Sequence, residues 1–543
     1  MKKTLLWMAA LGFALAACGG SGAGPSAAGP EREGSAWTEV ASPHFTLRTD
    51  LDAKTAQDVS SQLETIFSSL LELGFDSALG PATEMRTHID LVYFRNGDEY
   101  RRVAPKLSVG EFRRELHDFE RTPLALFYGD FVQRTREIVQ HELTHFFVHA
   151  HYPQAPIWLD EGLAEYFSTL ELTDGSAVLG RPPKMLRFWK GPWHSENVDG
   201  EIRTSIPMSE AIPVGTLLGM DVQAFEGMSN ADPNTAAGQK ASQAMATNYA
   251  SAWNLVHVLM VDPNYRRRFD KYRRRLLEGD ASDISWEETM DDVPLPALEK
   301  AYEASLVRFE TTIQRTQYAP PRTPAPRVRA LSDADVHVMW ARLRNWETPE
   351  GRAAAEADMK EAAAREPLHP DLAALRAYWS TRQDDLENAA KALEPALAAR
   401  PNDARLLNAL GWVQVRRIAK KELPPSALDP VVAKLTPIAS TAAEFDLLAH
   451  GRAVHGDMNA ALTYEKRATT ADPSCYACFF YGSILLDAKG RVREALQAAS
   501  LAVHMLPDGA QVPNEMLTQM ALYRRRLSET TGNAPSAPRP PTR

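Results

Sequence analysis

Two histidines and a glutamate lie within one short stretch of the chain, HELTH, at residues 141–145. On an α-helix, His141 and His145 project from one face about 6 Å apart, a separation that a tetrahedral zinc ion can bridge. Glu142 is turned roughly 100° from His141, so it can reach a metal-bound water without binding the metal. The pattern is typical of metal-assisted hydrolysis, in which zinc lowers the pKa of its water toward about 7 and the glutamate accepts the proton.

A zinc ion held by two histidines still needs a third protein ligand. The next acidic cluster, in WLDEGLAEYF at residues 158–167, follows a short stretch with two prolines, which leaves room for a loop and a second helix. Glu161 is therefore the candidate third ligand. Glu165 lies one turn further on the same face, where its carboxylate can accept a hydrogen bond from the outer nitrogen of a ligating histidine. We expect Glu165 to orient a ligand rather than to bind the metal.

Together, HELTH and WLDEGLAEYF resemble the motifs of the gluzincin metallopeptidases, in particular of a bacterial branch with a peptidase-MA-like domain. The resemblance spans about residues 42–309 and is strongest at these two motifs. It implies one zinc ion bound by His141, His145 and Glu161, with Glu142 as the general base.

A further similarity lies in NYASAWNLVHVLM, residues 248–260, where the family has a tyrosine that stabilises the oxyanion; Tyr249 is the matching position. The chain departs from the family in lacking, upstream of His141, the GxMEN stretch that binds a substrate's amino group in the aminopeptidases. The resemblance therefore implies an endopeptidase. His149 and His151 follow the motif; a second metal site is the alternative, but we expect these residues to have structural roles at the helix end or in the loop.

The elements that must position this site are expected over residues 37–316, the metallopeptidase domain. Alternating apolar residues predict strands over 44–50 and 87–94, with a helix near 56–73 between them, and helices dominate after residue 135. The expected fold class is α+β, mainly helical. A zincin-like metallopeptidase domain, with a small sheet and active-site helices, precedes an all-α tetratricopeptide-like solenoid.

A proline-rich segment, residues 317–333, is the predicted linker, and repeats follow over residues 334–528. Prolines recur 34 residues apart, and small residues recur with them; these positions are Pro367 and Pro401, Pro473 and Pro507, Gly456 and Gly490, Ala355, Ala389, Ala461 and Ala495, and Ala362, Ala396, Ala468 and Ala502. Small residues let two antiparallel helices approach, and proline ends the second helix. The pattern resembles the tetratricopeptide repeat, with a small insertion near AKKELPPSALDP.

The N-terminus predicts export. Residues 1–17 join two lysines to an apolar run that is too short to span a bilayer, as in a signal peptide. LAAC resembles the bacterial lipobox, which implies cleavage before Cys18 and lipid attachment there; the alternative is a plain secretory signal. Residues 18–36 are expected to form a flexible tether, and residues 529–543 a disordered tail. Aspartate directly after the lipidated cysteine usually signals retention in the inner membrane, but residue 19 is glycine. We therefore expect a lipid-anchored protein of the bacterial cell envelope, in the outer membrane and facing the periplasm or the exterior.

The composition narrows the possible partners. The composition, with 44% apolar and 24% charged residues, is typical of a soluble globular protein. A chain of 543 residues is longer than one hydrophobic core normally organises, so we expect at least two domains. A net charge of -10 without a basic block argues against nucleic acid. The arginine-dense residues 264–279 are expected to form the solvated face of a helix. Cys475 and Cys478 could form a disulfide in an exported protein; a structural role or free thiols are expected rather than a thioredoxin-like catalytic pair, because the sequence around them is helical.

The expected function is that of a lipid-anchored zinc endopeptidase whose repeats bind a protein substrate or partner. The alternative is a non-catalytic envelope scaffold, in which zinc stabilises the fold and the repeats bind partners. Glu142 favours catalysis, because a structural zinc site has no use for a base, and no fourth protein ligand is evident in the sequence.

Overall fold

The structure is a computed structural model. It describes residue 30 and residues 36–531, apart from 77–87, 105–109, 114–122, 130, 132, 153–154, 174, 184–185, 199–200, 222–223, 226–234, 308–312, 473, 505 and 507–511. The predicted signal peptide, Cys18 and most of the tether lie outside the described residues. None of the described helices has both the length and the apolar character needed to cross a membrane. The chain forms two compact units that divide after Pro367.

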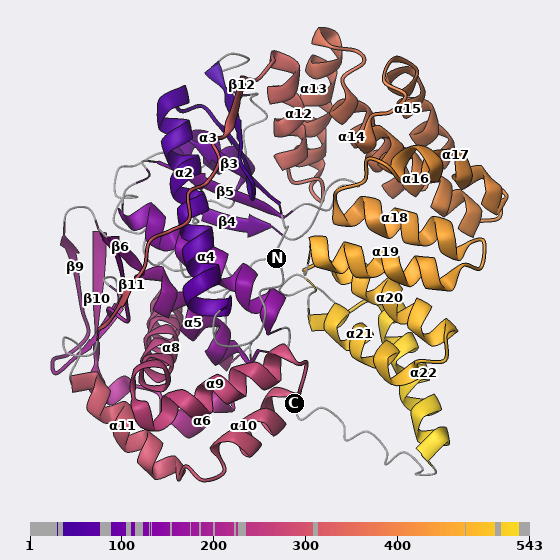
Figure 1. Cartoon of the computed structure of the whole chain (residues 1–543). Helices are drawn as coiled ribbons and strands as arrows, with labels where there is room; N and C mark the ends of the chain where they lie inside the picture. The colour runs from indigo at the N-terminus through magenta and orange to yellow at the C-terminus, as the bar shows by residue number, and fades with distance from the viewer. Residues whose placement is uncertain are drawn as a thin grey trace. The chain divides into compact units, whose positions relative to one another are not determined.

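A six-stranded mixed sheet is the centre of the first unit (Figure 1). Its strand order is β12 (Arg327–Ala330), β1 (Thr38–Ala41), β2 (Phe45–Thr49), β3 (Ile89–Phe94), β5 (Leu124–Tyr128) and β4 (Gly110–Arg113). β2, β3 and β5 are parallel, whereas β12, β1 and β4 run antiparallel to their neighbours. Every residue of β3 is buried, as expected of a strand covered on both faces. The two strands predicted from the sequence are confirmed as β2 and β3.

Helices cover both faces of this sheet. α2 (Ala53–Leu70) contacts β1 and β2, and its Phe67 packs edge-on against Phe45. On the other face, alternate residues of β3 pack against α12 (Asp333–Leu343), where the ring of Trp340 meets that of Phe94 at 87°. α3 (Gly97–Val103) contributes to the same cluster. Successive side chains of a strand point to opposite faces of the sheet, so one set packs on the side of α2 and the other on the side of α12.

The prediction that residues 317–333 form a linker is wrong, because part of this segment belongs to the sheet of the first unit. Within residues 317–333, β12 pairs with β1 at the edge of the sheet, and α12 follows directly. Nη1 of Arg342, on α12, lies 2.7 Å from Oδ2 of Asp90 on β3. α13 (Pro349–Arg365) pairs with α12 and belongs to the first unit. The boundary therefore lies near residue 367. An edge strand whose four residues are all exposed carries no apolar alternation, so the sequence pattern did not reveal β12.

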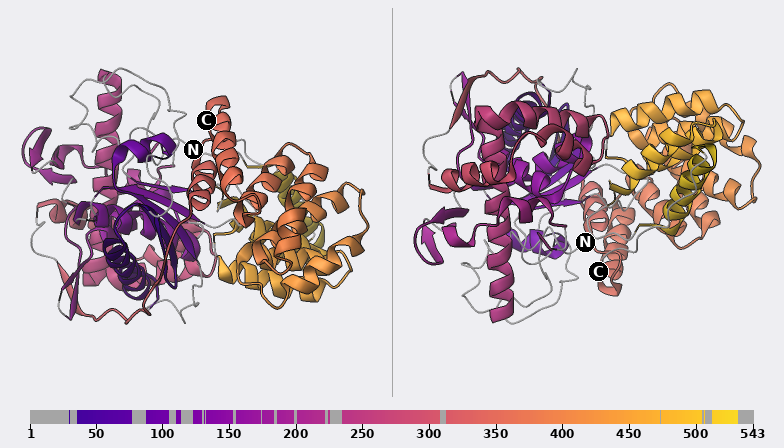
Figure 2. Two further views of the ribbon diagram at one scale, coloured as in Figure 1. Left: turned by 90° about the horizontal axis from the view of Figure 1, so that it is seen from above. Right: turned by 90° about the horizontal axis from the view of Figure 1, so that it is seen from below.

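The rest of the first unit is less purely helical than predicted. Two three-stranded sheets form from β6 (Glu171–Thr173), β7 (Ser176–Leu179) and β11 (Gln314–Gln317), and from β8 (Leu186–Trp189), β9 (His194–Val198) and β10 (Glu201–Pro207). The remaining helices are α4 (Gln133–His151), α5 (Ile157–Ser168), α6 (Val214–Leu218), α8 (Ala236–Val261), α9 (Pro263–Leu277), α10 (Ser282–Met290) and α11 (Leu295–Val307). α8 is the long magenta helix that both views of Figure 2 show side-on.

The second unit is a helical solenoid, as predicted. Its helix pairs are α14 (Pro370–Arg382) with α15 (Leu386–Ala399), α16 (Ala404–Ala419) with α17 (Asp429–Leu435), α18 (Ala442–Ala453) with α19 (Met458–Ala471), and α20 (Tyr476–Ala488) with α21 (Val492–His504), before α22 (Asn514–Thr531). The first helices begin 34, 38 and 34 residues apart, so the predicted insertion lies between α16 and α18. All eight of the recurring alanines are at most 2% exposed, including Ala355 and Ala362, which lie on α13 of the first unit.

The turns within the helix pairs explain the recurring glycines. Gly456 and Gly490 have φ angles of 80° and 75°, a left-handed conformation that favours glycine. Asp384 takes the same kind of conformation in the first pair, with φ of 64°. The predicted tail begins as helix, because α22 continues to Thr531, and residues 532–543 lie outside the described part of the chain.

Candidate metal centre

α4 carries both histidines of the HELTH motif. His141 and His145 are one turn apart and buried, with their rings at 79° to each other. Nε2 of His141 lies 3.1 Å from Nε2 of His145, so the two nitrogens converge on one point. Phe146 and Phe147 occupy the neighbouring positions and are buried, which packs the opposite side of α4 into the core. The helix thus presents a pair of imidazoles on one face, as the spacing predicts.

α5 brings the carboxylate of Glu161 to the same point. The helix follows Pro156, whose extended backbone conformation ends the preceding loop. Oε2 of Glu161 lies 3.6 Å from Nε2 of His141 and 3.4 Å from Nε2 of His145. At these distances Oε2 accepts no hydrogen bond of good geometry from the described residues. The three predicted ligands are therefore brought together by two helices adjacent in sequence.

The spacing of these three atoms fits zinc. With bonds of about 2.0–2.1 Å, any two ligands of a tetrahedral zinc ion lie about 3.3–3.4 Å apart. The observed separations are 3.1, 3.4 and 3.6 Å. Two imidazole nitrogens and one carboxylate oxygen are also a usual donor set for a zinc site that keeps its fourth position open. The residues present therefore fit the metal that the sequence motif implies.

Close packing of α5 against α8 completes the site. A Cβ atom at Gly162 would lie 2.6 Å from Cγ2 of Val256 and 2.7 Å from the carbonyl oxygen of Ala252, so only glycine allows this approach. The approach lets the hydroxyl group of Tyr249, on α8, donate a hydrogen bond of 3.0 Å to Oε1 of Glu161. Tyr249 is thus at the site, but its hydroxyl binds the predicted third ligand. The oxyanion role remains a prediction.

Glu165 lies where the sequence placed it, beside His141, a predicted metal ligand. Its Oε1 is 3.6 Å from Nδ1 of His141, the nitrogen that faces away from the other ligands. This distance is long for a hydrogen bond, but the residue is on the expected side of the ring. Glu142 is buried on α4 next to His141. Its role as a base stays a prediction.

The electrostatics of the site favour a cation. Burial raises the pKa of Glu161 above its usual value, although His145 opposes the shift. Burial and the charge of Glu161 raise the pKa of Glu165 well above its usual value. Burial also lowers the pKa of His141 well below its usual value, and a neutral imidazole is the form that binds a metal. A divalent ion would supply the positive charge that buried carboxylates need to stay ionised.

The structure adds Asp160 to the site, a residue that the sequence analysis did not single out. Its Oδ1 lies 2.8 Å from Nδ1 of His145, and its Oδ2 lies 2.6 Å from Nε2 of His149. Acidic residues are common in the first turn of a helix, where they interact with the helix dipole, so Asp160 carried no distinctive signal.

His149 and His151 both lie within α4, which continues to residue 151, and neither is in a loop. Nδ1 of His151 is 2.9 Å from the carbonyl oxygen of Phe147, and its ring packs near Phe75, consistent with the predicted structural role. His149 differs, because it contacts the carboxylate that holds a predicted metal ligand.

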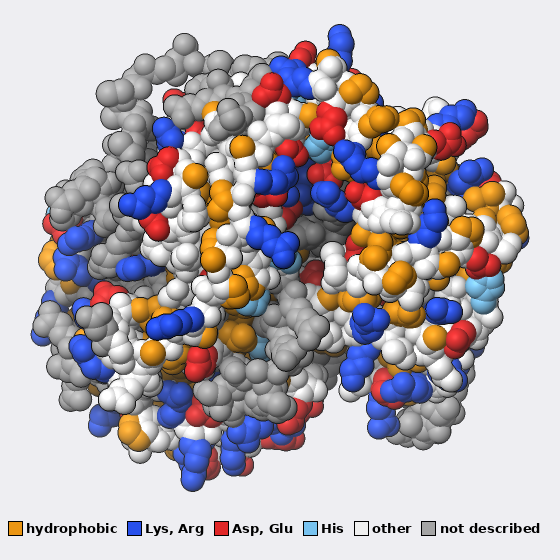
Figure 3. All heavy atoms as spheres, turned by 45° about the horizontal axis from the view of Figure 1, so that its top comes forward, with side chains coloured by type: hydrophobic (Ala, Val, Ile, Leu, Met, Phe, Trp, Pro, Cys, Tyr) orange, Lys and Arg blue, Asp and Glu red, His pale blue; other side chains and the backbone are white. Residues whose placement is uncertain are grey.

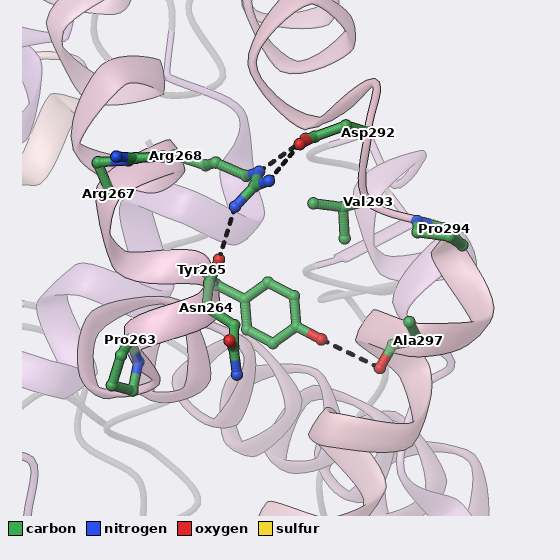
Figure 4. Close-up of a pocket in the computed structure, with 9 residues that line it drawn as sticks. All are labelled: Pro263, Asn264, Tyr265, Arg267, Arg268, Asp292, Val293, Pro294 and Ala297. Carbon is green, nitrogen blue, oxygen red and sulfur yellow. Dashed lines mark hydrogen bonds and ion pairs between the residues drawn. The ribbon is translucent and has the colours of Figure 1, made fainter.

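A pocket lies elsewhere on the first unit, away from the candidate metal centre. A pocket of about 490 Å³ opens between the start of α9 and the start of α11 (Figure 4). The guanidinium group of Arg268 pairs with Asp292 across it, and the hydroxyl group of Tyr265 donates to the carbonyl oxygen of Ala297 at 3.2 Å. None of the predicted metal ligands lines this pocket. The pocket is therefore not the candidate metal site.

The arginine-dense segment forms α9, and several of its charges are paired. Arg268 contacts Asp292, and Arg273 contacts Asp270 at 2.7 Å. Arg273 is buried, so the helix is not solvated all along its basic side. On the face shown in Figure 3, acidic and basic side chains are interspersed.

Cys475 and Cys478 form a disulfide at the start of α20 in the second unit. Both are buried, and both belong to the core of the solenoid. This agrees with the structural role predicted for the pair.

No protein-family model matches the chain, and no curated protein matches it. Two solved structures that are similar to part of it are both crystal structures of MamA. One is 16% identical and covers 29% of this chain and 84% of that chain, with a TM-score of 0.23. The other is 15% identical and covers 30% of this chain and 94% of that chain, with a TM-score of 0.21.

Proposed function

We propose that the first unit is a zinc-dependent peptidase that hydrolyses internal peptide bonds. One observation carries the proposal: Nε2 of His141, Nε2 of His145 and Oε2 of Glu161 are 3.1–3.6 Å apart, at the spacing of zinc ligands. Glu142, the proposed base, is next to the first of these residues on the same helix.

The residues of the site divide the chemistry among them. A zinc ion at this site would supply a Lewis acid that polarises a peptide carbonyl group and acidifies water. The carboxylate of Glu142 would accept a proton from the attacking water and return it to the leaving amine. Tyr249, which holds Glu161 in the structure, would have to turn its hydroxyl group toward the substrate to stabilise the oxyanion.

The sheet of the first unit supports an extended peptide as the substrate. β4 contacts α4, and β5 is its neighbour on one side. Among the described strands no other pairs with β4, so its second edge can offer backbone N–H and C=O groups to a peptide strand. Backbone pairing of this kind would present an internal bond of the substrate rather than a chain end.

We propose that the solenoid binds a protein partner or substrate, as stacked helix pairs do. We further propose that the protein is anchored by lipid at Cys18 in the outer membrane of a bacterial envelope. The Cys475–Cys478 disulfide supports an oxidising compartment. Labelled palmitate would be incorporated into the wild type and not into Cys18→Ala, and labelling of both proteins alike would count against the anchor.

A non-catalytic scaffold is the second candidate. It is favoured by the contact of Tyr249 with Glu161, because a tyrosine that only supports a ligand suits a structural metal site. In this case zinc would stabilise the first unit and the solenoid would carry the function.

Glu142→Gln separates the two candidates, because glutamine keeps the shape of the side chain and loses the base. Zinc content and cleavage of an unfolded protein substrate would be measured for the variant and the wild type. We expect about one zinc per chain in both, with cleavage reduced at least about 100-fold in the variant. A folded, zinc-loaded wild type that cleaves no faster than Glu142→Gln would favour the scaffold.

A further inference from the structure

We propose that His149 is a positioning residue of the metal centre, which acts through Asp160 to fix the ring of His145. The inference rests on the proposed zinc site and extends it by one further layer of hydrogen bonds. No part of the HELTH or WLDEGLAEYF motif includes His149, so the proposal comes from the tertiary contact alone.

Three histidines of α4 share one face. His141, His145 and His149 follow one another at intervals of four residues, so each lies one turn above the last. The rings of His145 and His149 are near-parallel, at 29°, with their centres 6.0 Å apart. The carboxylate of Asp160, from α5, bridges these two rings with contacts of 2.8 Å and 2.6 Å.

The carboxylate determines which nitrogens carry protons. An ionised carboxylate only accepts hydrogen bonds, so the nitrogens that face Asp160 must donate: Nδ1 of His145 and Nε2 of His149. A neutral His145 with its proton on Nδ1 has its lone pair on Nε2. That atom is the one that lies 3.4 Å from Oε2 of Glu161. Asp160 therefore holds His145 in the tautomer that can bind a metal.

His149 restrains the carboxylate itself. With only one hydrogen bond, the carboxylate of Asp160 could rotate about its Cβ–Cγ bond and release the ring of His145. The 2.6 Å contact from Nε2 of His149 to Oδ2 occupies the second oxygen and fixes the carboxylate plane. Only 12% of the side chain of Asp160 and 18% of that of His149 are exposed, so water competes weakly for these bonds.

A second metal ion is the other reading of this cluster, since ligand atoms of His145, His149 and Asp160 lie within 4.8 Å of one another. That ion would require His145 to bind metals through both ring nitrogens and to lose its Nδ1 proton. Hydrogen bonds from both rings to the carboxylate of Asp160 give Nδ1 of His145 and Nε2 of His149 a partner without that loss.

Zinc affinity of the full chain tests the proposal, measured by competition with a chromogenic chelator. His149→Leu removes the donor, whereas His149→Gln keeps an N–H group at about the same reach. His151→Leu is the matched control, because His151 is on the same helix and contacts Phe147 rather than Asp160. We expect His149→Leu to weaken zinc binding by about 10–100-fold, His149→Gln to recover most of the loss, and His151→Leu to bind like the wild type.

The outcomes distinguish this proposal from the function on which it rests. If the wild type binds zinc, His145→Ala abolishes binding and His149→Leu binds normally, the positioning role is wrong and the zinc site stands. Equal losses in His149→Leu and His149→Gln would show a packing effect and also overturn the role.

A wild type that binds no zinc would overturn both proposals. Should His149→Leu fail to fold, His149→Asn, whose shorter amide cannot reach Oδ2, replaces it. A second zinc ion per chain that is lost in His149→Leu would favour the two-metal reading instead.

Discussion

The hydroxyl group of Tyr249 donates a hydrogen bond of 3.0 Å to Oε1 of Glu161, a residue 88 positions earlier in the chain. This bond leaves Oε2 of Glu161 to face the two histidines. We expect Tyr249→Phe to weaken zinc binding by about 10–150-fold, because a buried charge-assisted hydrogen bond contributes about 1.5–3 kcal/mol. The measurement is the zinc dissociation constant, with circular dichroism to confirm the fold.

The same variant tests the role that the family resemblance implies. If Tyr249 instead stabilises the oxyanion, Tyr249→Phe would lower kcat by about 100–1,000-fold with an unchanged zinc dissociation constant. That result would contradict the ligand-holding role.

Gly162 allows α5 and α8 to meet, and Gly162→Ala should destabilise the first unit by about 1–3 kcal/mol. The added Cβ would lie 2.7 Å from the backbone oxygen of Ala252, which cannot move without shifting α8. Chemical denaturation measures the change. Gly219→Ala is the control, because a Cβ there makes ordinary contacts of 3.7 Å or more. Equal stability of the two variants would show that α5 and α8 are not tightly packed.

Truncation tests the boundary after Pro367. A chain of residues 37–367 should unfold cooperatively, whereas one of residues 37–316 should not fold. The shorter chain lacks β12 and α12, including five buried side chains that pack on the sheet, Leu331, Val336, Met339, Trp340 and Leu343. At roughly 1.5–3 kcal/mol each, their burial is comparable to the whole stability of a domain. A cooperative thermal transition of the 37–316 chain, at the temperature of the longer chain, would support the boundary predicted from the sequence.

His257 makes stability depend on pH. Its ring is buried on α8, stacked on Trp253, and burial lowers its pKa to about 4. The unfolded chain binds the proton below about pH 6.5 and the folded chain only below about pH 4, so stability falls as the pH decreases between these values. From pH 7 to pH 5 we expect a loss of about 2 kcal/mol from this residue.

His257→Leu should remove that part of the pH dependence. Urea unfolding at pH 7 and pH 5, in the presence of a chelator so that metal release does not contribute, measures it. His194→Gln is the control, because His194 is half exposed on β9. The assignment fails if wild type and His257→Leu lose the same free energy over this range.

Much of the site could be predicted because two of the predicted ligands, His141 and His145, lie one turn apart on the same helix. Helix geometry alone places His141 and His145 on one face, and the structure has their Nε2 atoms 3.1 Å apart. The 34-residue period likewise predicted the solenoid, because buried alanines and left-handed glycines recur wherever the same helix pair is built. β12 was not predicted, because an exposed edge strand has no apolar pattern to detect.

The sequence by itself determined the spacing of His141 and His145, the 34-residue repeats and the presence of a mixed and a helical part, since each depends on a pattern along the chain. It did not determine where the two parts divide. The tertiary structure alone decided that Tyr249 binds Glu161 and that Asp160 joins His145 to His149. These contacts depend on how closely α5 packs against α4 and α8. The distance between two packed helices depends on the volumes of the side chains between them, and here above all on the absence of a Cβ atom at Gly162. The pattern of apolar residues within one helix does not predict that distance.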